Sequence, residues 1–349
     1  MKVCQHLVLG VFCVLGLLFA WCPNECAAWD NLLNVCVASN TQANFTLQKI
    51  GDNYLVCWED SRRTGYKDIY GQMFDNNSNI SWTAGGNLLV VAGAVVESRT
   101  NYNSLSTIFL APNSTNEFFL AWMEGTDTRD LNCYINCYNL SASPQWGEAG
   151  ITVQAGDSGT SASIATDGEG GVFASWYYGG WSLWYDRTRA ANFDSDGTVA
   201  MAYGSMSDDS GGNGPPANDS RMTYISPGVA IIAWKDNENG AYSGWKSLRA
   251  QKLDSTGRAW GGTGVRLSLA PTVITNLVGS YDVAADGNDG IIGVWNDARY
   301  GNNDIFAQLV NGSGSIMWGT GGMAVCTDSS SQSNPKLTSD GNGGAVFVW

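Results

Sequence analysis

A short apolar run that closes on tryptophan recurs six times along this chain, and this recurrence limits the possible folds more than any other feature. Residues 54–58 (YLVCW) and 290–295 (GIIGVW) are two of the copies. Successive copies lie 54 to 64 residues apart, measured from tryptophan to tryptophan. The repeated tryptophans are Trp58, Trp122, Trp176, Trp234, Trp295 and Trp349. A period of this kind indicates a repeat architecture, in which each unit buries its apolar face against the next unit.

The first residues form a separate segment. Lys2 precedes an apolar run over residues 7–20, and a polar stretch then leads to Cys26-Ala27-Ala28. The run is shorter than the roughly 18 residues that a membrane-spanning helix needs, and small residues at its end are typical of a signal-peptidase site. The pattern predicts a secretory signal peptide over residues 1–28 and an exported mature chain that does not insert into the membrane. A lipoprotein anchor at Cys22 is less favoured, because a bulky tryptophan precedes it.

The composition of the chain favours an all-β fold. Strand-forming residues dominate the runs between clusters of Gly, Asn, Asp and Ser, and no helical period is evident. The formal net charge is −14, so a nucleic-acid backbone or an anionic membrane surface would repel the protein. We therefore expect neither as a partner.

A second signature follows each tryptophan and is clearest in residues 295–308 and 58–72. An aspartate lies two residues after the tryptophan, an arginine two residues later, and a second aspartate before an Ile-Phe or Ile-Tyr pair. The repeated positions are Trp58, Asp60, Arg62, Asp68, Trp122, Trp176, Trp234, Asp236, Trp295, Asp297, Arg299, Asp304 and Trp349. Residues that recur in copy after copy are expected to be scaffold, and a carboxylate and a guanidinium in one hairpin can fix its shape by charge-assisted hydrogen bonds.

Each unit predicts four strands. One precedes a turn such as residues 340–344, one ends at the tryptophan, one covers residues 304–310, and one enters Trp318. Four-stranded units of this length favour a β-propeller over a helical solenoid or an immunoglobulin array. Residues 29–37 resemble residues 318–327, so the chain begins inside a blade and can close the ring. Because the last copy stops at Trp349, we expect a single propeller domain over residues 29–349 with about six blades, the last of them incomplete through C-terminal truncation.

The pattern resembles a family of bacterial secreted β-propeller proteins built from Trp-x-Asp-x-Arg-x-Gly-x-x-Asp-Ile-Tyr-x-Gln repeats followed by Gly-x-x-x-Trp-Gly. The resemblance covers essentially the whole mature chain. It implies a β-propeller fold in a protein that is secreted or held at the cell surface, and it assigns no ligand. A looser similarity to the sialidase Asp box exists at residues 254–260, but one extra residue separates its aspartate from its glycine. We interpret that segment as a turn between blade strands.

Five cysteines remain in the mature chain. Cys36 and Cys326 hold the same repeat position, which favours two small core residues over a disulfide pair. Cys133 and Cys137 lie four residues apart on one strand, which is too far for an easy disulfide, and a metal site would need two further ligands. We therefore expect no metal and no cofactor.

Several catalytic chemistries are excluded by composition. The only histidine, His6, leaves with the signal peptide, which removes Ser-His-Asp, Cys-His and histidine–metal sites from the mature chain. A glycoside hydrolase needs only two carboxylates, and it stays open. The Asp-Gly turns at Asp167, Asp286 and Asp340 are typical hairpin signals and are favoured as such over calcium ligands.

Function is expected where copies depart from the repeat. The third copy inserts residues 177–185 and the fourth inserts residues 242–245, both after the second strand, and residues 205–221 join these two copies. In an up-and-down blade these loops emerge on one face. The predicted binding residues are Trp181, Trp184, Tyr185, Tyr242, Trp245, Asp208 and Asp209. Rigid rings beside polar groups are typical of sugar-stacking or protein-binding patches, although packing between blades would also account for some of these rings.

The sequence therefore predicts an extracellular or cell-surface recognition or adhesion scaffold whose partner is a glycan or an extracellular protein. The alternative is a propeller-type glycoside hydrolase that uses carboxylates, and a third possibility is a purely structural surface repeat. A cluster of carboxylates around the central channel would favour the enzyme. An aromatic patch without such a cluster would favour binding.

Overall fold

The computed structural model of the chain describes residues 35–36, 38, 41–63, 66–91, 106–114, 116–125, 131–154, 162–178, 187–206, 218–236, 247–268 and 278–349. All regular structure in these residues is β-strand. The same residues contain no helix with the length and hydrophobicity that crossing a membrane requires. The predicted signal peptide, residues 1–28, lies outside the described residues.

The strands form five antiparallel sheets and a final hairpin, which we call blades 1 to 6 in chain order. Blade 1 contains β1 (Gln42–Ile50), β2 (Asn53–Asp60), β3 (Asp68–Asp75) and β4 (Asn87–Val90). Blade 2 contains β5 (Ser106–Pro112), β6 (Glu117–Gly125), β7 (Leu131–Asn139) and β8 (Ile151–Gln154). Blade 3 contains β9 (Ala162–Thr166), β10 (Val172–Tyr178), β11 (Arg187–Phe193) and β12 (Val199–Ser205).

Blade 4 contains β13 (Asn218–Ser226), β14 (Val229–Asp236), β15 (Ser247–Asp254) and the short β16 (Gly257–Arg258) and β17 (Val265–Arg266). Blade 5 contains β18 (Val278–Ala285), β19 (Ile291–Asp297), β20 (Asp304–Val310) and β21 (Met323–Cys326). Blade 6 contains β22 (Lys336–Ser339) and β23 (Ala345–Val348). The prediction of an all-β chain built from four-stranded antiparallel units is confirmed. The blade count of the natural protein and the truncation stay predictions.

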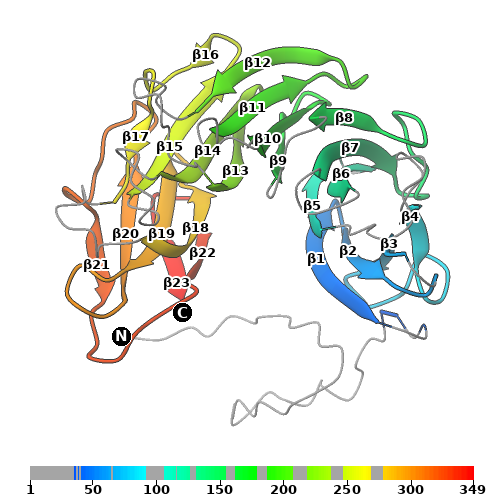
Figure 1. Cartoon of the computed structure of the whole chain (residues 1–349), viewed down its shortest axis with the longest axis horizontal. Coiled ribbons are helices and arrows are strands. Elements are labelled where there is room, and N and C mark those ends of the chain that lie inside the picture. The colour runs from blue at the N-terminus through cyan, green and yellow to red at the C-terminus, as the bar shows by residue number, and fades with distance from the viewer. Residues whose placement is uncertain are drawn as a thin grey trace.

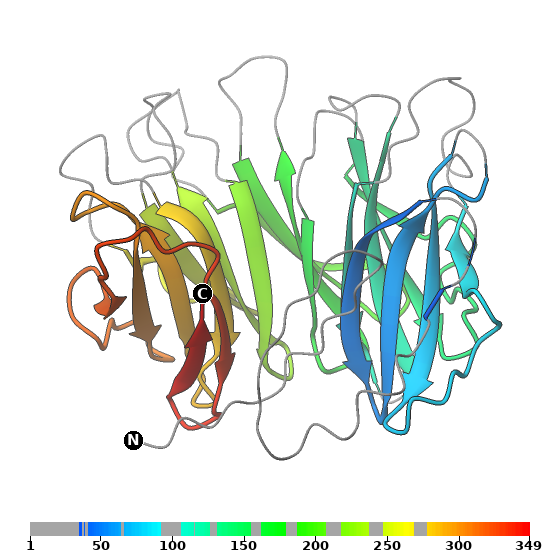
Figure 2. The ribbon, with the colours of Figure 1, turned by 90° about the horizontal axis from the view of Figure 1, so that it is seen from below.

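The blades follow one another around a common axis, as in a β-propeller (Figure 1). The first strand of each blade is the innermost one, and β1, β5, β9, β13, β18 and β22 contact one another in that order. Figure 2 shows the strands running roughly along the axis, with the turns between first and second strands gathered at one end. We call this the turn end. The opposite end, where second strands finish and first strands begin, is the loop end.

The apolar runs form the core between blades. Each repeated tryptophan from blade 2 to blade 5 faces the preceding blade: Trp122 packs with Leu55 of blade 1, and Trp295 packs with Ile231 of blade 4. Their side chains are almost completely buried. Because both faces of a second strand are covered by neighbouring blades, its sequence is a continuous apolar run without alternation.

The position predicted for the fourth strand is wrong. In blade 5 the fourth strand, β21, begins after Trp318, and Trp318 itself lies in the preceding turn. A buried glutamine of the third strand holds that turn, since Gln308 Oε1 accepts a bond from Trp318 N at 2.8 Å and Gln308 Nε2 donates to Gly319 O at 2.6 Å. The apolar residues before the tryptophan are thus part of the turn, where Ile316 forms an isolated bridge with Val310.

This turn tryptophan also connects neighbouring blades. The indole Nε1 of Trp82 donates to Leu140 O of blade 2 at 2.7 Å, and the indole Nε1 of Trp146 donates to Ser195 O of blade 3 at 2.8 Å. Trp260 makes the same kind of bond with Gly312 O of blade 5 at 3.1 Å. The Trp-Gly element that follows the third strand in the sequence is therefore a clamp between blades.

The first described residues cover the free face of blade 1. Residues 35–36 pack on Val56 of β2, while residues 325–326 of blade 5 pack in a cluster with Phe347 of β23. Val56 and Phe347 hold the same repeat position, two residues before the tryptophan. Residues 35–36 therefore lie beside blade 1 as the fourth strand of blade 5 lies beside blade 6.

All five described cysteines are free thiols. Cys57, Cys133 and Cys137 are buried, and burial raises the pKa of Cys133 to about 12. A thiol in this environment stays protonated and behaves as a small apolar core residue.

Candidate functional site

The seven residues predicted to form a binding patch all lie outside the described residues. They are Trp181, Trp184, Tyr185, Tyr242, Trp245, Asp208 and Asp209. The strands on either side of them are described: β10 finishes and β11 begins at the loop end, and so do β14 and β15. The patch stays a prediction.

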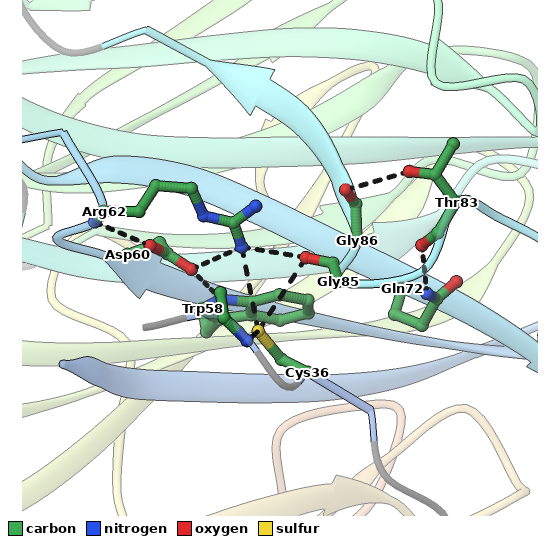
Figure 3. A network of polar contacts seen from close by, with 9 residues as sticks. Cys36, Trp58, Asp60, Arg62, Gln72, Thr83, Gly85 and Gly86 are labelled. Carbon is green, nitrogen blue, oxygen red and sulfur yellow. Dashed lines mark hydrogen bonds and ion pairs between the residues drawn. The ribbon is translucent and has the colours of Figure 1, made fainter. Parts of the chain in front are cut away.

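The repeated hairpin residues of blade 1 form hydrogen bonds with one another (Figure 3). Trp58 Nε1 donates to Asp60 Oδ2 at 2.9 Å, and Arg62 Nη2 donates to the same oxygen at 2.7 Å. Arg62 Nη2 also donates to Gly85 O, at 2.8 Å, in the turn before the fourth strand. The guanidinium lies 3.6 Å from the ring centroid of Tyr70. We call this arrangement of tryptophan, aspartate, arginine and turn carbonyl the latch.

Blade 5 has the same latch. Asp297 accepts bonds from Trp295 Nε1 at 2.8 Å and from Arg299 Nη2 at 2.5 Å, and Arg299 Nη1 donates to Gly321 O at 2.9 Å. The guanidinium lies 3.6 Å from the ring centroid of Phe306. Both charged side chains are nearly inaccessible, at 7% and 5% exposure.

Blade 4 has a partial latch with its arginine at another position, and Trp234 Nε1 has no hydrogen-bond partner among the described residues. Its hairpin supplies Asp236, and the arginine comes from the third strand: Arg249 Nε lies 3.3 Å from Asp236 Oδ2, and Arg249 Nη1 donates to Thr263 O at 3.1 Å. Arg249 pairs with Trp234 across the sheet, at the position that Tyr70 and Phe306 hold in blades 1 and 5. The arginine thus replaces the ring on which the other two arginines lie. Alignment of the hairpins alone misses this partner.

The hydrogen bonds within the latch stabilise the charged form of its aspartate. Burial alone would raise the pKa of Asp60, but the hydrogen bonds from Arg62 and Trp58 outweigh it and hold that pKa below its ordinary value. Such a carboxylate stabilises the fold above the ordinary pKa of aspartate, and the contribution is lost as the pH falls through the folded-state pKa. Because both carboxylate oxygens of Asp60 accept bonds from within blade 1, the latch there offers no free carboxylate to a substrate.

The second repeated aspartate has different environments in blades 1 and 5. Asp68 accepts bonds from Arg63 Nη2 at 2.6 Å and from Arg63 Nε at 3.1 Å. In blade 5 the position of Arg63 is held by Tyr300, and Asp304 Oδ1 is buried without a hydrogen-bond partner among the described residues. Burial raises the pKa of Asp304, nearby Asp297 raises it further, and Arg299 partly opposes both.

This difference predicts opposite effects of one substitution. Asp304→Asn is expected to raise the urea midpoint at neutral pH, whereas Asp68→Asn is expected to lower it, because the first change removes an unpaired buried charge and the second removes a paired one. Since the folded-state pKa of Asp304 is raised, its ionisation destabilises the fold as the pH rises through that pKa. The gain from Asp304→Asn should therefore shrink as the pH falls toward the ordinary aspartate pKa. A shift of the same sign in both variants would contradict this interpretation.

A different set of polar pairs lies at the loop end of the two innermost strands. In each pair, the residue after the repeated tryptophan contacts a residue of the first strand. The pairs are Asn44 Nδ2–Glu59 Oε1 at 2.8 Å, Lys235 Nζ–Asp219 Oδ2 at 3.0 Å and Ser280 Oγ–Asn296 Oδ1 at 2.8 Å. We call them the mouth pairs, because the first strands surround the central channel and the pairs lie where these strands begin.

The backbone turns these side chains toward their partners. The first strands of blades 1, 4 and 5 each have a register shift where the mouth pair lies. Asn44 and Asp219 are left-handed there, with φ of 51° and 58°, and Asn334 of blade 6 has a φ of 55° at the equivalent position. Asn and Asp adopt this conformation more readily than other residues with side chains, and bulges re-aim side chains near functional sites.

The polar groups at the loop end of blades 4 to 6 are joined across the blades. Lys235 Nζ donates to Gly279 O at 3.4 Å, and Asn334 N donates to Ser280 Oγ at 2.9 Å. Tyr281 Oη donates to Asp219 O and, at 3.1 Å, to Ala233 O. A continuous polar band therefore follows the inner strands of these blades at the loop end.

Sequence reasoning missed the mouth pairs. Their members lie 15 or 16 residues apart, and their chemistry changes from amide–carboxylate to ammonium–carboxylate to hydroxyl–amide. The available signal was the residue after the tryptophan, which varies between a constant tryptophan and a constant aspartate in the first, fourth and fifth copies. The described residues hold no group of three or more His, Cys, Asp or Glu side chains placed to bind a metal ion.

Comparison with solved structures finds a similar fold in a polysaccharide lyase, the PL25 ulvan lyase solved bound to -[GlcA(1-4)Rha3S]-. The TM-score is 0.52 at 8% sequence identity, over 84% of this chain and 73% of the lyase. An endo-arabinase from Bacteroides thetaiotaomicron matches with a TM-score of 0.39 at 11% identity, over 86% of this chain and 100% of that protein. An arabinanase of Bacillus subtilis matches with a TM-score of 0.40 at 11% identity, over 80% and 98% of the two chains.

The similarity to the lyase shows a shared fold, and the two lower TM-scores carry no argument. No protein-family model and no curated protein match this chain.

Proposed function

We propose that this chain is a carbohydrate-active β-propeller that binds a glycan at the loop end of its central channel. The observation that carries the proposal is the contrast between two repeated geometries. The latch keeps its chemistry and pairs its aspartate with an arginine of the same blade, whereas the mouth pairs keep their geometry and change their chemistry from blade to blade. Variation on a fixed scaffold is what recognition of an asymmetric ligand requires, because each blade then offers a different donor or acceptor.

The chemistry of the mouth pairs suits a polyhydroxylated ligand. Asp219 is 40% exposed and offers carboxylate oxygens, while the pairs of blades 1 and 5 add amide and hydroxyl groups. Sugar hydroxyls both donate and accept hydrogen bonds, so a row of mixed donors and acceptors can orient a sugar ring. The fold shared with a polysaccharide lyase shows that a scaffold of this shape carries a glycan site in that protein, and the argument for this chain rests on its own residues.

The aromatic residues predicted from the sequence belong to the same proposal. Trp181 and Trp245 follow β10 and β14 in the sequence, and both of these strands finish at the loop end. An indole ring beside hydrogen-bonding groups would stack on a sugar face. In this proposal residues 1–28 direct secretion, the protein acts outside the cell or at its surface, and the repeat signature marks it as one of the bacterial secreted propellers.

Glycoside hydrolysis is a second candidate, and one observation favours it. Asp219 and Asp282 come from the inner strands of adjacent blades, and each lies within ion-pair distance of Arg221, at 3.9 and 3.8 Å. Two carboxylates on either side of a bound sugar are the minimum that this chemistry needs. Release of reducing ends that is lost in Asp282→Asn, while the substrate still binds, would establish this activity.

A polysaccharide-binding screen tests the proposal on the mature chain. Asp219→Asn is expected to weaken binding of a neutral glycan about tenfold, since a hydrogen bond to a charged group contributes roughly 1.5–3 kcal/mol and asparagine keeps the left-handed backbone. Asp52→Asn is the matched control, because Asp52 is exposed in the β1–β2 turn at the turn end. The double variant Trp181→Ala/Trp245→Ala tests the aromatic part. Unchanged glycan affinity in both variants of the loop end would overturn the proposal.

A further inference from the structure

A row of charged residues lies just inside the mouth pairs, on the inner strands of blades 4 to 6. Arg221, Asp282 and Lys336 pair across their sheets with Ala233, Val294 and Val348. Each of these three partners immediately precedes a repeated tryptophan, so the charged residues hold one repeat position. In blades 1, 2 and 3 that position is held by residues without charge, namely Thr46, Phe109 and Ser163. The row is therefore confined to one side of the channel.

The two cations of the row keep unused hydrogen-bond donors. Arg221 Nη1 lies 3.8 Å from Asp282 Oδ1, and Arg221 Nη2 lies 3.9 Å from Asp219 Oδ1, distances that are longer than hydrogen bonds. Arg221 Nε has no hydrogen-bond partner among the described residues. Lys336 Nζ lies 3.9 Å from Asp282 Oδ2 and is on a side chain that is 58% exposed. Both cations therefore lie near a carboxylate but form no hydrogen bond with it.

Asp282 keeps the two cations in place. It lies between Arg221 of blade 4 and Lys336 of blade 6, and its own hydrogen bond comes from Leu337 N at 3.3 Å. The guanidinium of Arg221 lies 5.3 Å from the ring centroid of buried Tyr281, which limits where it can move. Arg221, Lys235 and Lys336 share the two carboxylates of Asp219 and Asp282. These ion pairs leave a local excess of one positive charge, in a chain whose net charge is −14.

We propose that the glycan of the proposed function is acidic, and that Arg221 and Lys336 bind its carboxylate or sulfate groups; this inference rests on that proposed function. A guanidinium can bind such a group by two parallel hydrogen bonds, and the lysine adds a point charge from the neighbouring strand. Asp282 competes for the same cations. It therefore lowers the affinity for an acidic ligand while it prevents the cations from repelling each other in the free protein.

The competition predicts that removing the charge of Asp282 has a larger effect on binding of an acidic glycan than removing the charge of a distant carboxylate such as Asp52. Asp282→Asn is expected to tighten binding of an acidic glycan about five- to tenfold, because it removes one negative charge near the bound anion. Lys336→Gln is expected to weaken it by a similar factor. Lys49→Gln is the control, since Lys49 is exposed on the inner strand of blade 1 near the turn end. Binding of a neutral glycan should be the same in all of these variants.

The probes are two matched pairs of polysaccharides, measured by titration calorimetry on the mature chain. Polygalacturonate and its methyl-esterified form test a carboxylate, and κ-carrageenan and its desulfated form test a sulfate. We expect at least tenfold tighter binding of one acidic member than of its neutral partner, with a loss of affinity in Lys336→Gln. Equal binding of both members, unaffected by Lys336→Gln, would overturn the inference and leave the proposed function standing. Binding of none of the four would count against both.

Discussion

Replacement of Asp297 by alanine is expected to lower the free energy of unfolding by about 3–5 kcal/mol, the usual cost of removing one partner of a buried ion pair. The change leaves the guanidinium of Arg299, which is only 7% exposed, without its carboxylate. It also leaves the indole Nε1 of Trp295 without its acceptor. Urea denaturation followed by tryptophan fluorescence measures the loss.

Two companion variants separate this mechanism from general damage to the blade. Asp297→Ala combined with Arg299→Met should recover part of the lost stability, because the buried positive charge is then gone as well. Asp52→Ala, in the exposed β1–β2 turn, should change the stability by no more than about 0.5 kcal/mol. A loss of less than about 1 kcal/mol in Asp297→Ala would contradict the role assigned to the latch.

Substitution of Gly322 by alanine is expected to cost about 3 kcal/mol. Gly322 precedes the fourth strand of blade 5 with a φ of +81°, and a Cβ there would lie 2.6 Å from Ala307 O and from the indole of Trp295. A left-handed backbone costs a residue with a side chain about 1–2 kcal/mol, and forcing an atom into a packed site adds about 1–3 kcal/mol. Calorimetric or urea unfolding of the variant gives the total.

Gly319, three residues earlier in the same turn, isolates the two contributions. It has a φ of +85°, and a Cβ there would meet nothing within 4 Å. Gly319→Ala should therefore show the backbone cost alone, about 1 kcal/mol. Equal losses in the two variants would mean that the close approach of the turn to Trp295 contributes nothing.

Much of the fold follows from the sequence because each blade is specified locally. The apolar run before Trp295 and the polar turns around it define the strands of one blade, and the period of the tryptophans places the blades in order. The start of the fourth strand was not predictable in this way. Trp318 is apolar and follows strand-like residues, but its amide and the carbonyl of Gly319 are held by Gln308, a contact that only the folded blade reveals.

The site was harder to predict than the fold. The sequence points to aromatic insertions such as the one at Trp181, because an insertion is recognised as soon as the repeats are aligned. The mouth pairs bring together residues of two different strands, and Asp219 and Lys235 become neighbours only when the strands pair with a bulge between them. Arg249 was missed for the same reason. Its guanidinium comes from the third strand, whereas alignment of the repeats places the arginine in the hairpin.

A crystal structure of the mature chain with an oligosaccharide from the tightest-binding probe would test the central proposal most directly. We expect sugar density against the inner strands β13, β18 and β22, within hydrogen-bond distance of the mouth pairs and of Lys336. Density confined to the outer strands or to the turn end, with the channel mouth free of sugar, would contradict it.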